Sequence, residues 1–88
     1  MGKTYVTRGV HKSVSVVEVF RCLSRHARGD WGDMDTEDRE SNERALVSGA
    51  RLFSGYKLDD SRKVWVITEA IDDDGRRSAT MVLFPDEY

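Results

Sequence analysis

The second half of the chain contains three short β-rich segments, and these constrain the fold more than any other feature. They span residues 50–58, 63–70 and 78–85, and each is rich in β-branched, aromatic or other apolar residues. Aspartate-containing turn sequences at residues 59–62 and 72–75 separate them. Two consecutive hairpins predict an antiparallel meander. The middle segment is apolar on both faces, as expected of a central strand.

A first helix is predicted at residues 16–28. Ser15 and Glu18 match the capping-box pattern, and Gly29 is suited to a left-handed C-terminal cap. The apolar residues of this segment lie on one helical stripe: Val16, Val19, Phe20, Leu23 and Ala27. The segment is therefore expected to pack one face on the sheet.

A second helix is predicted to begin at Asp35 or Thr36 and to end near Ser48. Acidic residues occupy its first turns, where the helix dipole favours negative charge. Its apolar residues are few and come late in the segment, at positions 45–47. We therefore expect it to lie on the surface with one end packed against the core.

A short edge strand is predicted at residues 3–10, before the helices. The order is then strand, helix, helix, strand, strand, strand, in one domain that covers residues 1–88. This order predicts an α+β fold, with a three- to four-stranded antiparallel sheet and two helices on one face. It resembles the topology of the RelE/ParE toxin fold.

Charge is distributed unevenly along the chain. The formal net charge is −2, from 14 Lys and Arg against 16 Asp and Glu. Residues 3–28 contain six basic residues and one acid, a balance of +5, whereas residues 30–43 contain seven acids and one base, a balance of −6. The acidic total disfavours direct nucleic-acid binding, which usually requires a basic surface.

Cysteine content and hydropathy indicate the compartment. With a single cysteine, Cys22, no intrachain disulfide can form, which fits a reducing cytoplasm. No apolar run is long enough to span a membrane, and no apolar segment of a secretory signal follows Lys3. We expect a cytoplasmic protein with no membrane partner and no cofactor.

The first candidate site is the cluster of His26, Asp30 and Trp31. His26 falls in the last turn of the first predicted helix, and Asp30 is close enough in sequence to orient it. One interpretation is an acid–base pair, or a binding hotspot anchored by Trp31. The other is a structural helix end, with the tryptophan closing the edge of the core.

The second candidate site is the acidic run at residues 30–43. Asp33, Asp35 and Glu37 alternate as in a calcium-binding loop, but the required glycine and distal glutamate are not at the right offsets. No metal site is therefore predicted. The run is either a solvated helix face or a surface that contacts a basic partner.

Two further patterns suggest interfaces. Arg21, Arg25 and Arg28 form one helical stripe, which either contacts phosphate or pairs with acids of the second helix. The acids considered for such pairing are Asp38, Glu40 and Glu43. Tyr56 and Trp65 lie on adjacent predicted strands, and one of them should face the open side of the sheet. An exposed aromatic there would mark an interface, for example of a homodimer.

Several short motifs along residues 20–88 carry a family resemblance. The motifs are His26-x-x-Gly29-Asp30-Trp31-Gly32, Glu37-Asp38 with Asn42, Arg51-Leu52-x-Ser54-x-Tyr56, residues 63–69 and Leu83-x-Pro85-x-Glu87-Tyr88. Together they resemble a family of small proteins carried by plasmids, phages and integrative elements. Its members are often labelled "plasmid-related protein" or "type I restriction endonuclease subunit M".

The resemblance implies a mobile-element origin and no established activity. The methyltransferase label conflicts with this sequence, which has no cofactor-binding glycine loop. Residues 71–77 depart from the family pattern as a longer hairpin loop.

Three functions follow as hypotheses. The favoured one is a non-enzymatic mobile-element protein that binds a host protein or protein–nucleic acid complex, for example as an anti-CRISPR or anti-restriction inhibitor. Its partner-binding residues would be His26, Asp30, Trp31, Glu37, Asp38 and Asn42. The second is a RelE-like endoribonuclease toxin that uses His11, Arg25, His26 and Arg28. The third is a small structural or regulatory homodimer.

Overall fold

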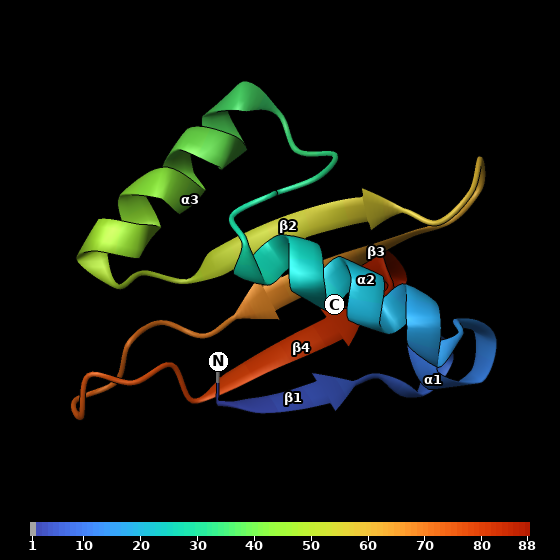
Figure 1. Cartoon of the computed structure of the whole chain (residues 1–88), viewed down its shortest axis with the longest axis horizontal. Coiled ribbons are helices and arrows are strands. Elements are labelled where there is room, and N and C mark those ends of the chain that lie inside the picture. The colour runs from blue at the N-terminus through green and yellow to red at the C-terminus, as the bar shows by residue number, and fades with distance from the viewer. Residues whose placement is uncertain (1) are drawn as a thin grey trace.

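The computed structural model describes residues 2–88 and has the predicted α+β class (Figure 1). Its elements, in chain order, are β1 (Lys3–Val6), α1 (Arg8–Ser13), α2 (Val16–Ala27), α3 (Thr36–Ser48), β2 (Leu52–Lys57), β3 (Lys63–Thr68), β4 (Ala79–Leu83) and the short 3-10 helix η1 (Pro85–Glu87). No helix in this part of the chain is long and apolar enough to cross a membrane.

The sheet is mixed rather than antiparallel throughout. Its strand order is β1-β4-β3-β2, and β2, β3 and β4 form the predicted antiparallel meander. β1 runs parallel to β4, with Lys3 opposite Ala79 and Val6 opposite Val82, so the prediction of a wholly antiparallel sheet was wrong. After the helices, β2 runs in the same direction as β1. The two hairpins reverse the chain twice, so β4 also runs in that direction and pairs with β1 in parallel.

The predicted strand at residues 3–10 is shorter than expected, because α1 begins at Arg8. The Glu87 carboxylate lies at the start of this helix and accepts hydrogen bonds from Thr7 Oγ1 (2.6 Å) and Gly9 N (3.0 Å). α1 also buries Val10 in the core. These long-range contacts stabilise a six-residue helix whose sequence has little helical periodicity.

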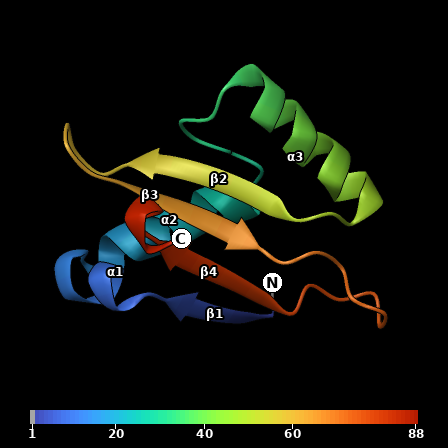
Figure 2. The same cartoon turned by 180° about the vertical axis from the view of Figure 1, so that it is seen from behind.

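Both predicted helices are present. Ser15 Oγ accepts a hydrogen bond from Glu18 N at the start of α2, and Asp35 accepts one from Asp38 N at the start of α3. α2 lies across one face of the sheet, whereas α3 lies along the β2 edge, as Figures 1 and 2 show. η1 and the C-terminus lie on the opposite side from α2 (Figure 2).

The main core fills the space between the sheet, α1 and α2. Its buried members are Val10, Cys22, Tyr56, Val64, Val66 and Val82. A smaller cluster joins α3 to β2 and consists of Trp31, Ala45 and Leu52, with Met34 packed against it. α3 therefore depends on a few contacts at the sheet edge.

Candidate functional site

The segment between α2 and α3 lies alongside the β2 edge. Gly55 N donates a hydrogen bond to the Trp31 carbonyl (3.2 Å), and Asp33 N donates one to the Gly55 carbonyl (2.6 Å). Gly32 and Gly55 form a parallel bridge between these two bonds. The Gly-Asp-Trp-Gly motif thus supplies backbone partners to an edge strand.

Asn42 of α3 completes the cover of the same edge. Its Nδ2 donates to the Phe53 carbonyl (2.6 Å), and its Oδ1 accepts from Phe53 N (2.9 Å). The side chain is buried. Asn42 therefore joins α3 to β2 by imitating one residue of a neighbouring strand.

Trp31 is directed inward and is only 5% exposed. It packs with Ala45 and Leu52, and its Nε1 donates a hydrogen bond to the Glu43 carboxylate (2.7 Å). The ring also meets the His26 ring edge-on, with centroids 5.8 Å apart. This geometry matches the interpretation in which the tryptophan closes the edge of the core.

Asp30 pairs with an arginine rather than with His26. Its carboxylate accepts two bonds from Arg25 (2.7 and 3.2 Å) and one from Gly32 N. The Arg25 guanidinium lowers the pKa of Asp30, helped by the Gly32 amide. The backbone carbonyl of Asp30 also accepts a hydrogen bond from the Tyr56 hydroxyl (2.7 Å). Asp30 therefore joins α2 to β2 through both its exposed carboxylate and its backbone.

His26 belongs to a buried polar network. Its Nδ1 lies 2.6 Å from Ser54 Oγ and its Nε2 lies 2.8 Å from Thr68 Oγ1, which in turn lies 2.8 Å from Thr80 Oγ1. The imidazole is 3% exposed. Burial, with a smaller effect from the positive charge of Arg77, lowers the pKa of His26 to about 4. At neutral pH the ring is uncharged and both nitrogens are engaged.

The sequence prediction missed the hydroxyl partners of His26 and the role of Arg77. Arg77 donates to the carbonyls of Ala45 (3.1 Å), Ala50 (2.7 Å) and Glu69 (3.1 Å), so it joins the end of α3 to the β3–β4 loop. A cavity of about 340 Å³ lies beside this region and is lined in part by Thr68. The signal in the sequence was the set of polar residues at inward positions of the strands, Ser54, Thr68 and Thr80.

The other predicted partner-binding residues, Glu37 and Asp38, lie on the exposed face of α3. Glu40 is exposed beside them, and within residues 2–88 none of these three side chains forms an ion pair. The nearby carboxylate of Asp35 raises the pKa of Asp38. The exposed side chains of α3 without an ion-pair partner in residues 2–88 form an acidic surface, which we define as Glu37, Asp38 and Glu40.

The arginines of α2 do not neutralise that acidic surface. Arg21 pairs with Glu18 (3.1 Å), Arg25 pairs with Asp30, and Arg28 donates to Ser24 (3.2 Å). In the described part of the chain, no ion pair joins α2 to α3, so the interpretation in which these arginines pair with Asp38, Glu40 or Glu43 does not hold. The Arg25–Asp30 pair joins the basic and acidic segments where they meet, while the acidic surface of α3 is left without an arginine partner from α2 among residues 2–88.

The strand aromatics divide between the two faces of the sheet. Tyr56 is buried beneath α2, while Trp65 lies on the opposite face, as the sequence predicted for one of the pair. There Trp65 contacts Phe53 (centroids 4.8 Å apart) and the C-terminal Tyr88 (5.9 Å apart). Arg51 lies over the Tyr88 ring. This face is thus partly covered by the C-terminus of the chain.

Comparisons with protein-family models, curated proteins and solved structures find no match for this chain. The family resemblance and the RelE/ParE topology therefore stay predictions. Among the described residues, no three His, Cys, Asp or Glu side chains are grouped so that they could hold a metal ion.

Proposed function

We propose that this chain is a non-catalytic binding module whose acidic surface on α3 occupies a basic groove of a host protein or protein–nucleic acid complex. The observation that supports this most directly is that α3 packs on the sheet with one set of residues and exposes a different, acidic set to solvent. Its inward residues, Asn42 and Ala45, hold it on β2, while Glu37, Asp38 and Glu40 face solvent.

Electrostatics favours a partner that is basic. Carboxylates gathered on one helix face repel one another, and a groove lined by Lys and Arg would relieve that repulsion and accelerate association. Grooves of this kind commonly hold nucleic-acid phosphates. The mobile-element resemblance makes a CRISPR or restriction complex the class of partner to test first.

The geometry does not favour the endoribonuclease alternative. His26 is enclosed and uncharged at neutral pH, and both of its ring nitrogens contact hydroxyl groups. A general acid or base must reach the proton that it transfers. Arg25, the second proposed catalytic residue, is held by Asp30 and lies over the Tyr56 ring.

Affinity capture from the native host, followed by mass spectrometry, tests the proposal. The test variant is Glu37→Lys/Asp38→Lys/Glu40→Lys. The matched control is Asp60→Lys/Asp73→Lys/Asp74→Lys, which changes the net charge equally at exposed loop carboxylates. The proposal expects nucleic-acid-binding proteins to be captured by the wild type and the control and lost from the test variant. Equal capture by all three folded proteins would reject it.

A homodimer is the second candidate function, and the aromatic cluster on the open sheet face favours it. Met81 and Tyr5 are exposed on this face next to the cluster of Phe53, Trp65 and Tyr88. Sedimentation equilibrium should then give a dimer that Met81→Lys converts to a monomer. A monomeric wild type would exclude this candidate.

A further inference from the structure

The two edges of the sheet differ in whether other parts of the chain cover them. The β2 edge is covered by residues 31–33 and by Asn42 of α3. The β1 edge, in contrast, has no strand or helix of residues 2–88 beyond it, and every residue of β1 is exposed (Figure 1). An uncovered edge presents backbone groups on which another strand can form.

The outward backbone groups of β1 can be identified from its register. Lys3 N donates to the Ser78 carbonyl and Thr7 N donates to the Val82 carbonyl, so these amides face β4. Backbone groups alternate in direction along a strand. The amides and carbonyls of Thr4 and Val6 therefore face away from the sheet, toward an added strand.

An apolar groove of about 370 Å³ adjoins this edge, between β1 and α2. Thr4 and Val6 line it from the strand, and α2 contributes apolar side chains, including Val16 (69% exposed) and Phe20 (68% exposed). The side chains of an added strand alternate between the two faces of the sheet. One row would enter this groove, and the other would lie near Tyr5 on the open face.

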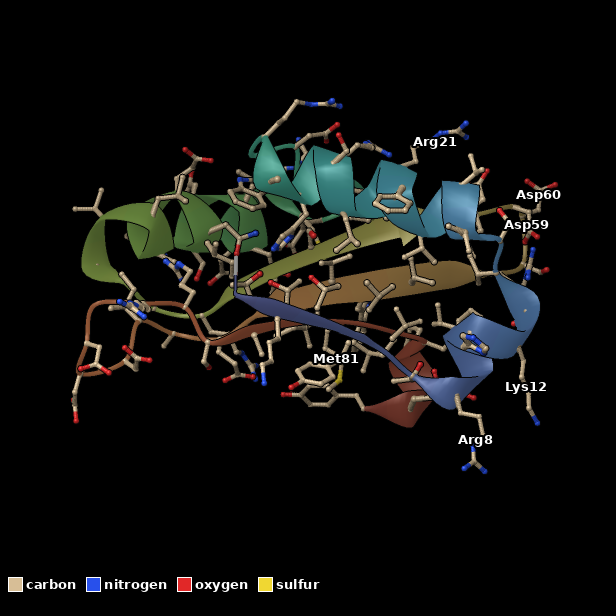
Figure 3. All side chains as sticks on the ribbon, turned by 60° about the horizontal axis from the view of Figure 1, so that its bottom comes forward. Arg8, Lys12, Arg21, Asp59, Asp60 and Met81 are labelled. Carbon is tan, nitrogen blue, oxygen red and sulfur yellow. The ribbon has the colours of Figure 1, made fainter. Side chains whose placement is uncertain are left out.

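Charge around the groove specifies the partner further. Figure 3 shows Arg8 and Lys12 extending from α1 at one side and Arg21 from α2 at the other. Lys3 adds a basic residue on the strand itself, whereas Arg21 is paired with Glu18. The net positive charge therefore comes from Lys3, Arg8 and Lys12. These bases lie on β1 and α1, beside the groove rather than in its lining. They favour acidic flanks on the occupant and disfavour a second copy of the chain, whose equivalent β1 edge would bring the same positive charges together.

We propose that the β1 edge and its groove bind an extended segment of another protein, with alternating apolar residues and acidic flanks, as a fifth strand of the sheet. Backbone bonds to Thr4 and Val6 supply affinity, and the groove beside Phe20 selects the apolar side chains. This surface is separate from the acidic surface of α3. Charge reversal on α3 therefore leaves peptide binding intact, so the two proposals can fail independently.

A display selection with random peptides of about twelve residues tests the proposal, because such a segment spans a four-residue strand with flanks on both sides. Enriched peptides are synthesised with a fluorophore and titrated by anisotropy. The groove variant is Phe20→Asp. Val47→Asp is the matched control, since Val47 is 91% exposed on α3. ¹⁵N NMR then follows the Thr4 and Val6 amides.

The expected peptides have apolar residues at every second position and acidic ends. Phe20→Asp should weaken their binding at least tenfold, Val47→Asp should leave it unchanged, and the Thr4 and Val6 amides should become protected from exchange. Failure of any peptide to prefer the wild type over Phe20→Asp overturns the proposal. So does a wild-type dimer that Phe20→Asp makes monomeric, because a second copy would then be the occupant.

Discussion

The side-chain amide of Asn42 contacts both backbone groups of Phe53, with Nδ2–O and Oδ1–N distances of 2.6 and 2.9 Å. One side chain of α3 thus pairs with an edge strand that has no neighbouring strand on this side among residues 2–88. Asn42→Ala would leave a partly buried amide and carbonyl without partners. We expect the free energy of unfolding to fall by about 1–3 kcal/mol in urea titrations. Ser41→Ala, at the exposed neighbouring position, is the control, and an equal loss in both variants would contradict this role.

The close approach of residue 32 to β2 gives a second prediction. Gly32 has φ = 72°, and a Cβ at this position would collide with the Gly55 carbonyl oxygen and the Tyr56 ring. Gly75 has a similar φ of 77° but open space around it. Gly75→Ala should therefore cost about 1 kcal/mol from backbone strain alone. Gly32→Ala should cost several times more in the same urea titration, and similar losses would disprove the close contact.

His26 makes stability depend on pH in the mildly acidic range. Its pKa is lowered to about 4 in the folded state, against an ordinary value of about 6.5 in the unfolded chain. The unfolded state therefore binds more protons between these values, and stability falls as the pH drops from about 6.5 to 4. The expected loss is about 3 kcal/mol.

Urea titrations across this pH range measure the effect of His26. His26→Gln, which does not titrate there, should show a flatter profile than the wild type. His11→Gln, which changes an exposed histidine, is the matched control. Parallel profiles for the wild type and His26→Gln would show that the imidazole is not buried in its neutral form.

Cys22 should react slowly in the folded protein. The thiol is buried in the main core, and desolvation, with a smaller effect from Glu18, raises its pKa. Both effects lower the thiolate concentration available to an alkylating reagent. Mass spectrometry should detect iodoacetamide labelling at least tenfold faster in urea than in buffer, whereas equal rates would place the side chain at the surface.

The local signals of the sequence predicted much of the fold. The caps at Ser15 and Asp35 are present where expected, and the turns at residues 59–62 and 72–75 do separate three antiparallel strands. α1 and the parallel pairing of β1 were not predicted. Both depend on partners more than 70 residues away, such as Glu87 at the start of α1, and local periodicity contains no such information.

The candidate site was predictable in part for the same reason. The acidic surface was predictable because Glu37 and Asp38 fall in the first turn of a predicted helix, where acidic side chains are favoured and usually exposed. The inward direction of Trp31 and Asn42 depends on the β2 edge, to which each is joined by tertiary contacts. Residue type alone did not separate a binding tryptophan from one that closes a core.

The central claim is that the exposed acids of α3, and not its packed residues, bind the partner. Its most direct test is a titration of the captured partner against the wild type and Glu37→Gln/Asp38→Asn/Glu40→Gln at several salt concentrations. The account predicts wild-type binding that weakens with salt and competes with nucleic acid, and at least tenfold weaker, less salt-sensitive binding by the variant. Equal Kd values with the same salt dependence would contradict it.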